Sequence, residues 1–511
     1  MKMVKSLLLG SAAGLVAVTG AQAADLPVKA KPVEYVKVCT LYGAGFYYIP
    51  GTDTCIKIGG FVRTEWNHNA AGSFSTYVQG DAARYNRATD TLVNRTRGLF
   101  SFDVRSQTEY GTLRSYVRSA WQWTTNTDTI GGSASTVYLD RAFIQFAGFT
   151  FGKTQSFFDV PDIADFTYQS EYTRNNTGGT GTPVFAYTAQ FGNGLSATIS
   201  AEDYSERRSN VVDLTFSGTS FGGQFVVGTS NASDNHGNEI PDIVGNLRVD
   251  QAWGSAQISG ALHLNQGQYY GTPSFSSTPI GQQGHPDDKW GYAVAGGILL
   301  KMPWDPKDTF AVAASYAKGA TAYVWSTPGS FGARSQGAAL YGDGVVAIGW
   351  LDDAYFGCGV TTSPTIPAGC AELQLPKAWN VQAGFQHYWT PTLRSSIWGS
   401  YSKFEANSSA VDEMVCAERG FGPGCSDFSA YQIGTRTIWN PVANLDIGLE
   451  VMYTKINTAF EGGTTAPLGV GGAAGPGGGT MPATNTVDPI RRIADADVWS
   501  GILRIQRNFW P

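Results

Sequence analysis

The sequence has few charged residues and no long hydrophobic run. Charged side chains make up 15% of its 511 residues, whereas a typical globular domain carries about 25%. The nearly uncharged apolar run WGYAVAGGILL at residues 290–300 falls well short of the roughly 20 residues that a membrane-spanning helix needs. The sequence therefore predicts no helical membrane span.

The side chains that usually carry catalysis and metal binding are also scarce. The five histidines are scattered, and none is spaced with an acid and a serine, or with other ligands, as a catalytic triad or a metal site requires. GTSFG at residues 218–222 matches GxSxG around Ser220, but both flanks read as strands, whereas a nucleophile elbow joins a strand to a helix. We therefore interpret it as a glycine-rich hairpin turn, and we expect no catalytic residue, no enzymatic activity, no metal and no cofactor.

Six cysteines fall into three pairs that are local in the sequence, and no CxxC spacing is present. Disulfides are therefore favoured over a zinc site, although six cysteines allow 15 connectivities. We expect local pairing, which would stiffen loops. The pairs are Cys39 with Cys55, Cys358 with Cys370, and Cys416 with Cys425.

The N-terminus is typical of an exported protein. Lys2 and Lys5 precede an apolar stretch and then AQA at residues 21–23, which predicts a signal peptide over residues 1–23. Its removal would change the formal net charge from −6 to −8, by two lysines. With no basic run in addition, nucleic acid is not an expected partner.

Beyond residue 55 the hydrophobic pattern repeats with a period of two. LRSYVRSAW at residues 113–121 could form a helix with adjacent apolar and cationic stripes. It could equally form a strand with Leu113, Val117 and Trp121 on one face and Arg114, Tyr116 and Arg118 on the other. Neighbouring segments alternate in the same way, which favours the strand.

Short turns and long polar connections alternate along the chain, a pattern that predicts an outer-membrane β-barrel with apolar residues toward lipid and polar residues toward a wet lumen. A secreted β-sandwich or jelly roll is the alternative, but it would not explain two loop lengths. Tryptophans at four turns suggest an interfacial girdle. The eight expected turns, which imply about 18 strands or 16 if one is only a bend, are 110–112, 147–149, 192–194, 218–223, 253–255, 303–308, 389–392 and 439–444.

The connection at residues 156–183 is rich in acids and is the candidate constriction loop. Folded inward, its acids would face lumenal arginines and create a transverse field that favours small polar solutes. It could instead be a solvated external loop, and charge counting does not separate the two. The candidate residues are Arg97, Arg105, Arg114, Arg118 and Arg141 on the wall, with Asp159, Asp162, Asp165 and Glu171 in the connection.

The sequence resembles the alphaproteobacterial, rhizobial-type porins over essentially the whole mature chain. The resemblance lies in VCTLYGAGFYYIPGTDTCIKIGGFVRTEW at residues 38–66, DRAFIQFAGFTFGKTQSFFD at 140–159 and GILRIQRNFW at 501–510. It implies an all-β, transmembrane antiparallel barrel, usually of 16 strands, whose third external loop folds into the pore, and it implies a homotrimer. Pro511 after the final aromatic pair departs from barrels that end on an aromatic residue.

We therefore expect a general-diffusion porin of the Gram-negative outer membrane that lets ions and small hydrophilic solutes pass. A substrate-selective channel is the alternative within transport, and an outer-membrane hydrolase is the alternative among enzymes. The expected division is a signal peptide at 1–23, an N-terminal periplasmic segment at 24–55 and a barrel in contact with outer-membrane lipid at 56–511.

Overall fold

A computed structural model describes most of the chain. The described residues are 37–70, 91–125, 133–168, 177, 181–203, 205, 207–214, 235–268, 285–325, 337–341, 345–357, 372–407, 427–458 and 492–509. The signal peptide predicted for residues 1–23 therefore lies outside them. Within them, no helix is long and apolar enough to cross a membrane.

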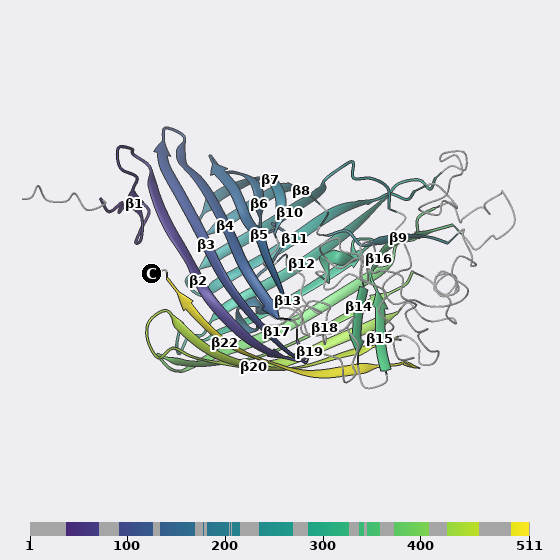
Figure 1. Ribbon diagram of the computed structural model, residues 1–511. Helices are drawn as coiled ribbons and strands as arrows, with labels where there is room; N and C mark the ends of the chain where they lie inside the picture. The colour runs from purple at the N-terminus through teal and green to yellow at the C-terminus, as the bar shows by residue number, and fades with distance from the viewer. Residues whose placement is uncertain are drawn as a thin grey trace, which may run out of the picture.

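Sixteen antiparallel strands form a closed barrel (Figure 1). Neighbours in sequence pair with one another, and β22 returns to pair with β2 from Phe61↔Asn508 to His68↔Gly501, which closes the sheet. The barrel strands are β2 (Cys55–His68), β3 (Leu92–Thr108), β4 (Gly111–Thr125), β5 (Ser133–Phe146), β6 (Phe149–Thr154), β7 (Thr182–Gly192), β8 (Leu195–Glu202), β10 (Asp242–Gln251), β11 (Gly254–Asn265), β12 (Lys289–Lys301), β13 (Thr309–Lys318), β17 (Lys377–Thr390), β18 (Leu393–Glu405), β19 (Phe428–Trp439), β20 (Leu445–Asn457) and β22 (Ala496–Asn508).

The strand number is 16 rather than 18 because seven of the eight expected turns join barrel strands. The eighth, residues 218–223, lies outside the described residues. The strand before it, β9 (Asn210–Asp213), pairs with β16 (Asp352–Phe356) in a two-stranded parallel sheet and not with the barrel. A period-two run followed by a turn signal is therefore not enough to identify a barrel strand.

The segment that could have been a helix is strand β4. Leu113, Val117 and Trp121 are 37%, 42% and 50% exposed on the outer face, whereas Arg114 and Arg118 are partly buried on the inner face. The expected separation of apolar and cationic faces is confirmed. Large apolar side chains exposed on the outer face are typical of a barrel whose wall faces lipid.

The tryptophans expected at the short turns lie on the barrel surface at that end. Trp253, Trp304, Trp389 and Trp439 are between 42% and 67% exposed, at turns that Figure 1 places at the same end as β1 (Tyr47–Tyr48) and the C-terminus. Aromatic rings at this level are typical of a membrane interface. They mark the end of the barrel that carries the short turns.

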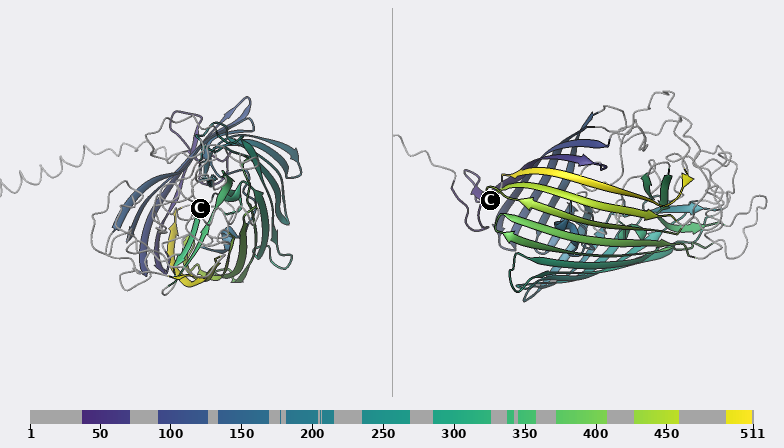
Figure 2. Two further views of the ribbon diagram at one scale, coloured as in Figure 1. Left: turned by 90° about the vertical axis from the view of Figure 1, so that its right-hand side faces the viewer. Right: turned by 90° about the horizontal axis from the view of Figure 1, so that it is seen from below.

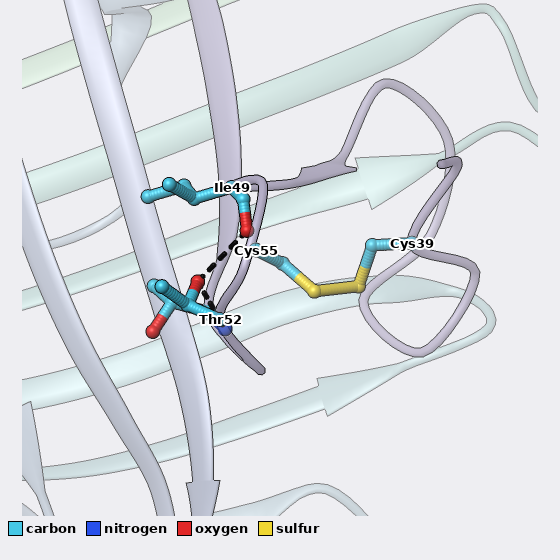
Figure 3. The surroundings of a disulfide bond; sticks show 5 residues. Cys39, Ile49, Thr52 and Cys55 are labelled. Carbon is cyan, nitrogen blue, oxygen red and sulfur yellow. Dashed lines mark hydrogen bonds between the residues drawn. A yellow bond between two sulfur atoms is a disulfide. The ribbon is translucent and has the colours of Figure 1, made fainter. Parts of the chain in front are cut away.

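The N-terminal segment is fastened to the first barrel strand. Cys39 forms a disulfide with Cys55 (Figure 3), β1 pairs with β2, and Phe46 is buried in one cluster with both cysteines. This confirms one of the three expected pairs. Cys358, Cys370, Cys416 and Cys425 lie outside the described residues.

Described parts of the long connections contribute structure inside the barrel. The loop between β6 and β7, which we call L3 (residues 155–181), contains the short 3-10 helix η2 (Ile163–Phe166). The connection between β13 and β17, which we call L6 (residues 319–376), contains η5 (Thr321–Tyr323), β14 (Gly337–Tyr341), β15 (Val345–Trp350) and β16, and β15 also pairs with β21 (Arg492–Ile493).

The described parts of L6 pack on the inner face of the wall. Tyr323, Trp325 and Leu340 are fully buried in an apolar cluster with the lumen-facing residues Phe428 and Ile456. The end-on view in Figure 2 shows the β14–β15 hairpin within the ring of strands. Long polar connections had been expected outside the barrel, so this inward packing is a feature that the sequence reading missed.

Candidate functional site

One sector of the lumen wall carries a concentration of arginine. Alternation along strands β2 to β5 and β22 directs eight arginines inward, and we call this set the arginine wall. The five arginines proposed from the sequence all belong to it. The set is Arg63 on β2, Arg95, Arg97 and Arg105 on β3, Arg114 and Arg118 on β4, Arg141 on β5, and Arg504 on β22.

Three carboxylates on the same sector each lie between two of these arginines. Charge-assisted hydrogen bonds of this kind hold guanidinium planes in fixed positions. The arrangement leaves positive charge in excess while every acid is neutralised. The groups are Glu65 with Arg95 at 2.6 Å and Arg504 at 2.7 Å, Asp103 with Arg105 at 2.8 Å and Arg114 at 2.9 Å, and Asp140 with Arg118 and, at 3.2 Å, Arg141.

A β-bulge brings Asp140 to the inner face. Arg118 is opposite Arg141 and Ser119 is opposite Leu139, so Asp140 has no partner in the ladder between β4 and β5. A bulge re-aims a side chain that regular alternation would direct outward. Simple period-two reading therefore could not place Asp140 and Arg141 together on the lumen face.

L3 follows the inner wall on the other side of the barrel. The Phe157 carbonyl oxygen accepts hydrogen bonds from Asn246 Nδ2 on β10 at 2.7 Å and Gln257 Nε2 on β11 at 3.2 Å. Further along, Ile163 and Phe166 of η2 are fully buried against wall residues that include Trp398. L3 therefore lies inside the barrel, which is the placement proposed for this connection.

The end of the described part of L3 is anchored to β19, β20 and β22. Glu450 accepts hydrogen bonds from Thr167 Oγ1 and from the Tyr168 backbone N–H, and Arg436 donates to the Asp165 carbonyl oxygen. The Arg504 guanidinium lies 3.5 Å from the Tyr168 ring centroid. Burial raises the pKa of the Tyr168 phenol above its ordinary range, although two nearby arginines oppose this.

Three glycines of the wall lie where L3 packs against the strands. An added Cβ would lie 2.3 Å from the Pro161 carbonyl oxygen at Gly297, 2.5 Å from the Phe166 ring at Gly384, and 2.2 Å from the Tyr168 hydroxyl at Gly448. Each separation is shorter than real Cβ contacts. The absence of side chains at these points on β12, β17 and β20 lets L3 approach the wall backbone.

The acids of L3 have partners other than those expected. Asp159 is buried in an ion pair with Arg207, which follows β8, and accepts hydrogen bonds from Thr177. Asp162 caps η2 by accepting from the Ala164 N–H at 2.7 Å. Asp165 is exposed on the side of η2 away from its buried residues, and Glu171 lies outside the described residues. The direct partners of the wall arginines are thus mainly wall acids rather than loop acids.

A buried polar cluster joins L6 to the barrel. Asp242 on β10 lies 2.8 Å from His263 Nδ1 on β11 and accepts a 2.5 Å hydrogen bond from the Tyr323 hydroxyl. Asp353 accepts from the backbone N–H groups of Thr321 and Ser209, both at 2.6 Å. Burial raises the pKa of the Tyr323 phenol well above its ordinary range, so the hydroxyl remains a donor to Asp242.

Sequence reasoning missed several residues of this site. Arg63, Arg95 and Arg504 share the period-two signal of the other wall arginines and could have been found by it. Alanines also face the lumen on β11 to β13. The signal for them is that strand β12 is apolar on both faces, as the run at residues 290–300 shows. A strand that is apolar on both faces is covered on both, here by lipid and by the inward loops.

Among the described residues, no group of three or more His, Cys, Asp or Glu side chains is placed to hold a metal ion. The arrangement offers fixed guanidinium groups along one side of a lumen and a docked loop along the other. It can attract, orient and restrict charged solutes.

Comparisons with known proteins agree with this geometry. A family model described as the porin subfamily matches residues 25–473. The porin Omp2a of Brucella canis is 34% identical over 275 residues, which cover 51% of this chain and 65% of that protein, and Omp2a of Brucella ovis is 35% identical over 280 residues, which cover 51% and 69%. The match to the Brucella canis protein thus spans less than two thirds of that relative. The outer membrane channel DcaP of Acinetobacter baumannii has the same fold, with a TM-score of 0.51, 15% identity, and coverage of 90% of this chain and 99% of that one.

Proposed function

Because this chain belongs to the porin subfamily, we propose that its barrel is a water-filled channel for the passive passage of ions and small hydrophilic solutes. The family, the fold and the lipid-facing surface place the protein in the outer membrane of a Gram-negative bacterium. The observation that carries the proposal is the contrast between exposed apolar residues outside and fixed ionic groups inside. Such a lumen solvates polar solutes and excludes apolar ones.

L3 is the constriction of this channel. Its anchored stretch follows the wall from β10 to β20 and reaches the edge of the arginine wall at Arg504 on β22. Asp165 projects from that stretch, and the wall arginines Arg97, Arg105, Arg114, Arg118 and Arg141 form the other side of the passage. Asp159 and Asp162 support the loop through Arg207 and η2 rather than facing solute.

Planar-bilayer recording tests the channel. We expect a large ohmic conductance that no single sugar or amino acid saturates, and no catalytic turnover. Saturation by one solute would support the substrate-selective alternative. Absence of conductance from a correctly folded barrel would contradict the proposal.

The variant Arg114→Ala, Arg118→Ala tests the constriction. Asp103 and Asp140 would keep Arg105 and Arg141 as partners, so the variant removes two positive charges without leaving an acid unpaired. Conductance should rise and the reversal potential in a salt gradient should move toward cation preference. An unchanged conductance and reversal potential would remove these residues from the constriction.

We also propose that the channel assembles as a homotrimer with one side of each barrel buried against its neighbours. Gel migration of unheated protein and native mass measurement test this. A conducting species that is purely monomeric after mild extraction would contradict it.

A further inference from the structure

The arginine wall has more positive charge than its own acids neutralise. It holds eight arginines and three carboxylates, whereas Arg248, elsewhere on the lumen wall, has an acid of its own and lies 2.7 Å from Asp250. Asp162 and Asp165 of L3 contribute two negative charges, fewer than the excess of five. The described lumen therefore has a positive side that nothing described there cancels.

Three pairs of wall arginines lie opposite one another across neighbouring strands. Like charges directly opposite each other in the ladder destabilise a sheet. Two pairs share a carboxylate. The pairs are Arg63↔Arg97, Arg105↔Arg114 and Arg118↔Arg141.

The Arg63↔Arg97 pair shares no carboxylate, and an amide oxygen accepts a short hydrogen bond from each guanidinium. Arg63 Nε donates to Gln506 Oε1 at 2.7 Å, and Arg97 Nε and Nη2 donate to Gln122 Oε1 at 3.0 and 2.5 Å. Among the described residues, the acid nearest to either guanidinium is Glu65, 3.6 Å from Arg63 and already held by two other arginines. The two amides orient the guanidinium groups without neutralising them.

We propose that the channel prefers anions and that Arg63 and Arg97 form a subsite for small oxyanions, such as phosphate and carboxylates. A guanidinium presents parallel N–H donors that match two oxygens of an oxyanion, whereas a halide accepts at one point. The neighbouring arginine pairs provide further weak binding positions along the wall, so an anion bound at this subsite can move on through the channel. The inference rests on the proposed channel function and names its solute class.

The test compares wild-type channels with three variants in planar bilayers. Arg63→Gln, Arg97→Gln removes the charge of the pair, and Arg63→Lys, Arg97→Lys keeps the charge but loses the forked donors. Arg507→Gln is the matched control, because Arg507 faces outward at the end of β22 and donates to turn carbonyl oxygens. Unheated gel migration shows that each barrel has folded.

We expect wild-type channels in potassium chloride to favour chloride, and inorganic phosphate to reduce the chloride current at concentrations well below that of chloride. The glutamine variant should lower the anion-to-cation permeability ratio by roughly twofold for each charge removed and should lose the phosphate effect. The lysine variant should keep the ratio and lose the phosphate effect, and Arg507→Gln should change neither.

Cation preference in wild-type channels would overturn the inference even if no glutamine variant folds. A glutamine variant with wild-type selectivity and phosphate response would also overturn it. A folded wild-type barrel that does not conduct would instead contradict the channel function itself, so the two failures are distinguishable.

Discussion

Adding one methyl group at Gly297 should loosen the docked L3. An alanine Cβ there would lie 2.3 Å from the Pro161 carbonyl oxygen and 2.8 Å from Val160 Cγ2. To reach an ordinary separation of 3.4 Å, the loop must move away from β12 by about 1 Å. Overpacking of this kind costs about 1–3 kcal/mol.

That cost acts on loop docking rather than on the barrel. Gly297 faces the lumen, and the backbone ladder of β12 does not change when the loop moves. Because 1.4 kcal/mol is a factor of ten in an equilibrium, the undocked fraction of L3 should rise about fivefold to hundredfold. Undocking widens the passage, so single-channel records of Gly297→Ala should show added noise and visits to higher conductance.

The neighbouring glycine provides the control. At Gly296 an added Cβ would have its nearest contact with Ile258 Cγ2 at 4.0 Å, an ordinary distance on the lipid face. Gly296→Ala should therefore have wild-type conductance and noise. If Gly297→Ala behaves in the same way, while both variants show the unheated gel migration of a folded barrel, the loop does not restrict the channel at this point.

Three further outcomes follow from the structure. Val117→Arg places a charge on the lipid face at a cost of roughly 2–4 kcal/mol near the midplane, so refolding yield should fall while any folded channel conducts normally; normal yield would place Val117 away from lipid. The raised pKa of Tyr168 means that its contribution to L3 docking is complete below about pH 10, the unfolded value, and is lost as pH rises through the folded pKa. Alkaline titration should therefore raise conductance together with tyrosinate absorbance, and Tyr168→Phe should remove this step. Replacing Cys39 and Cys55, which are 16 positions apart, by serine should lower the unfolding free energy by roughly 3 kcal/mol in denaturant titration, and an unchanged midpoint would show that the bond does not constrain the unfolded chain.

The sequence alone determined the class of fold and most of the wall. Alternation with a period of two is a local property, because neighbouring side chains of a strand point to opposite faces whatever the strand packs against. This alternation therefore assigned Trp121 and Arg118 to opposite faces of the strand, and the turn signals located seven of the hairpins. The Cys39–Cys55 bond was predictable for a similar reason, since its cysteines are near in the chain.

Only the tertiary structure decided what occupies the lumen. The path of L3 depends on contacts such as Tyr168 with Gly448, which are 280 positions apart in the sequence, and the fully buried Tyr323 shows that L6 also packs inward. Which acid pairs with each arginine depends on strand register and on the bulge at Asp140. The acids of L3, which the sequence placed opposite the wall arginines, therefore pair with other residues. Long-range packing and register are properties of the closed sheet, and a single strand does not contain them.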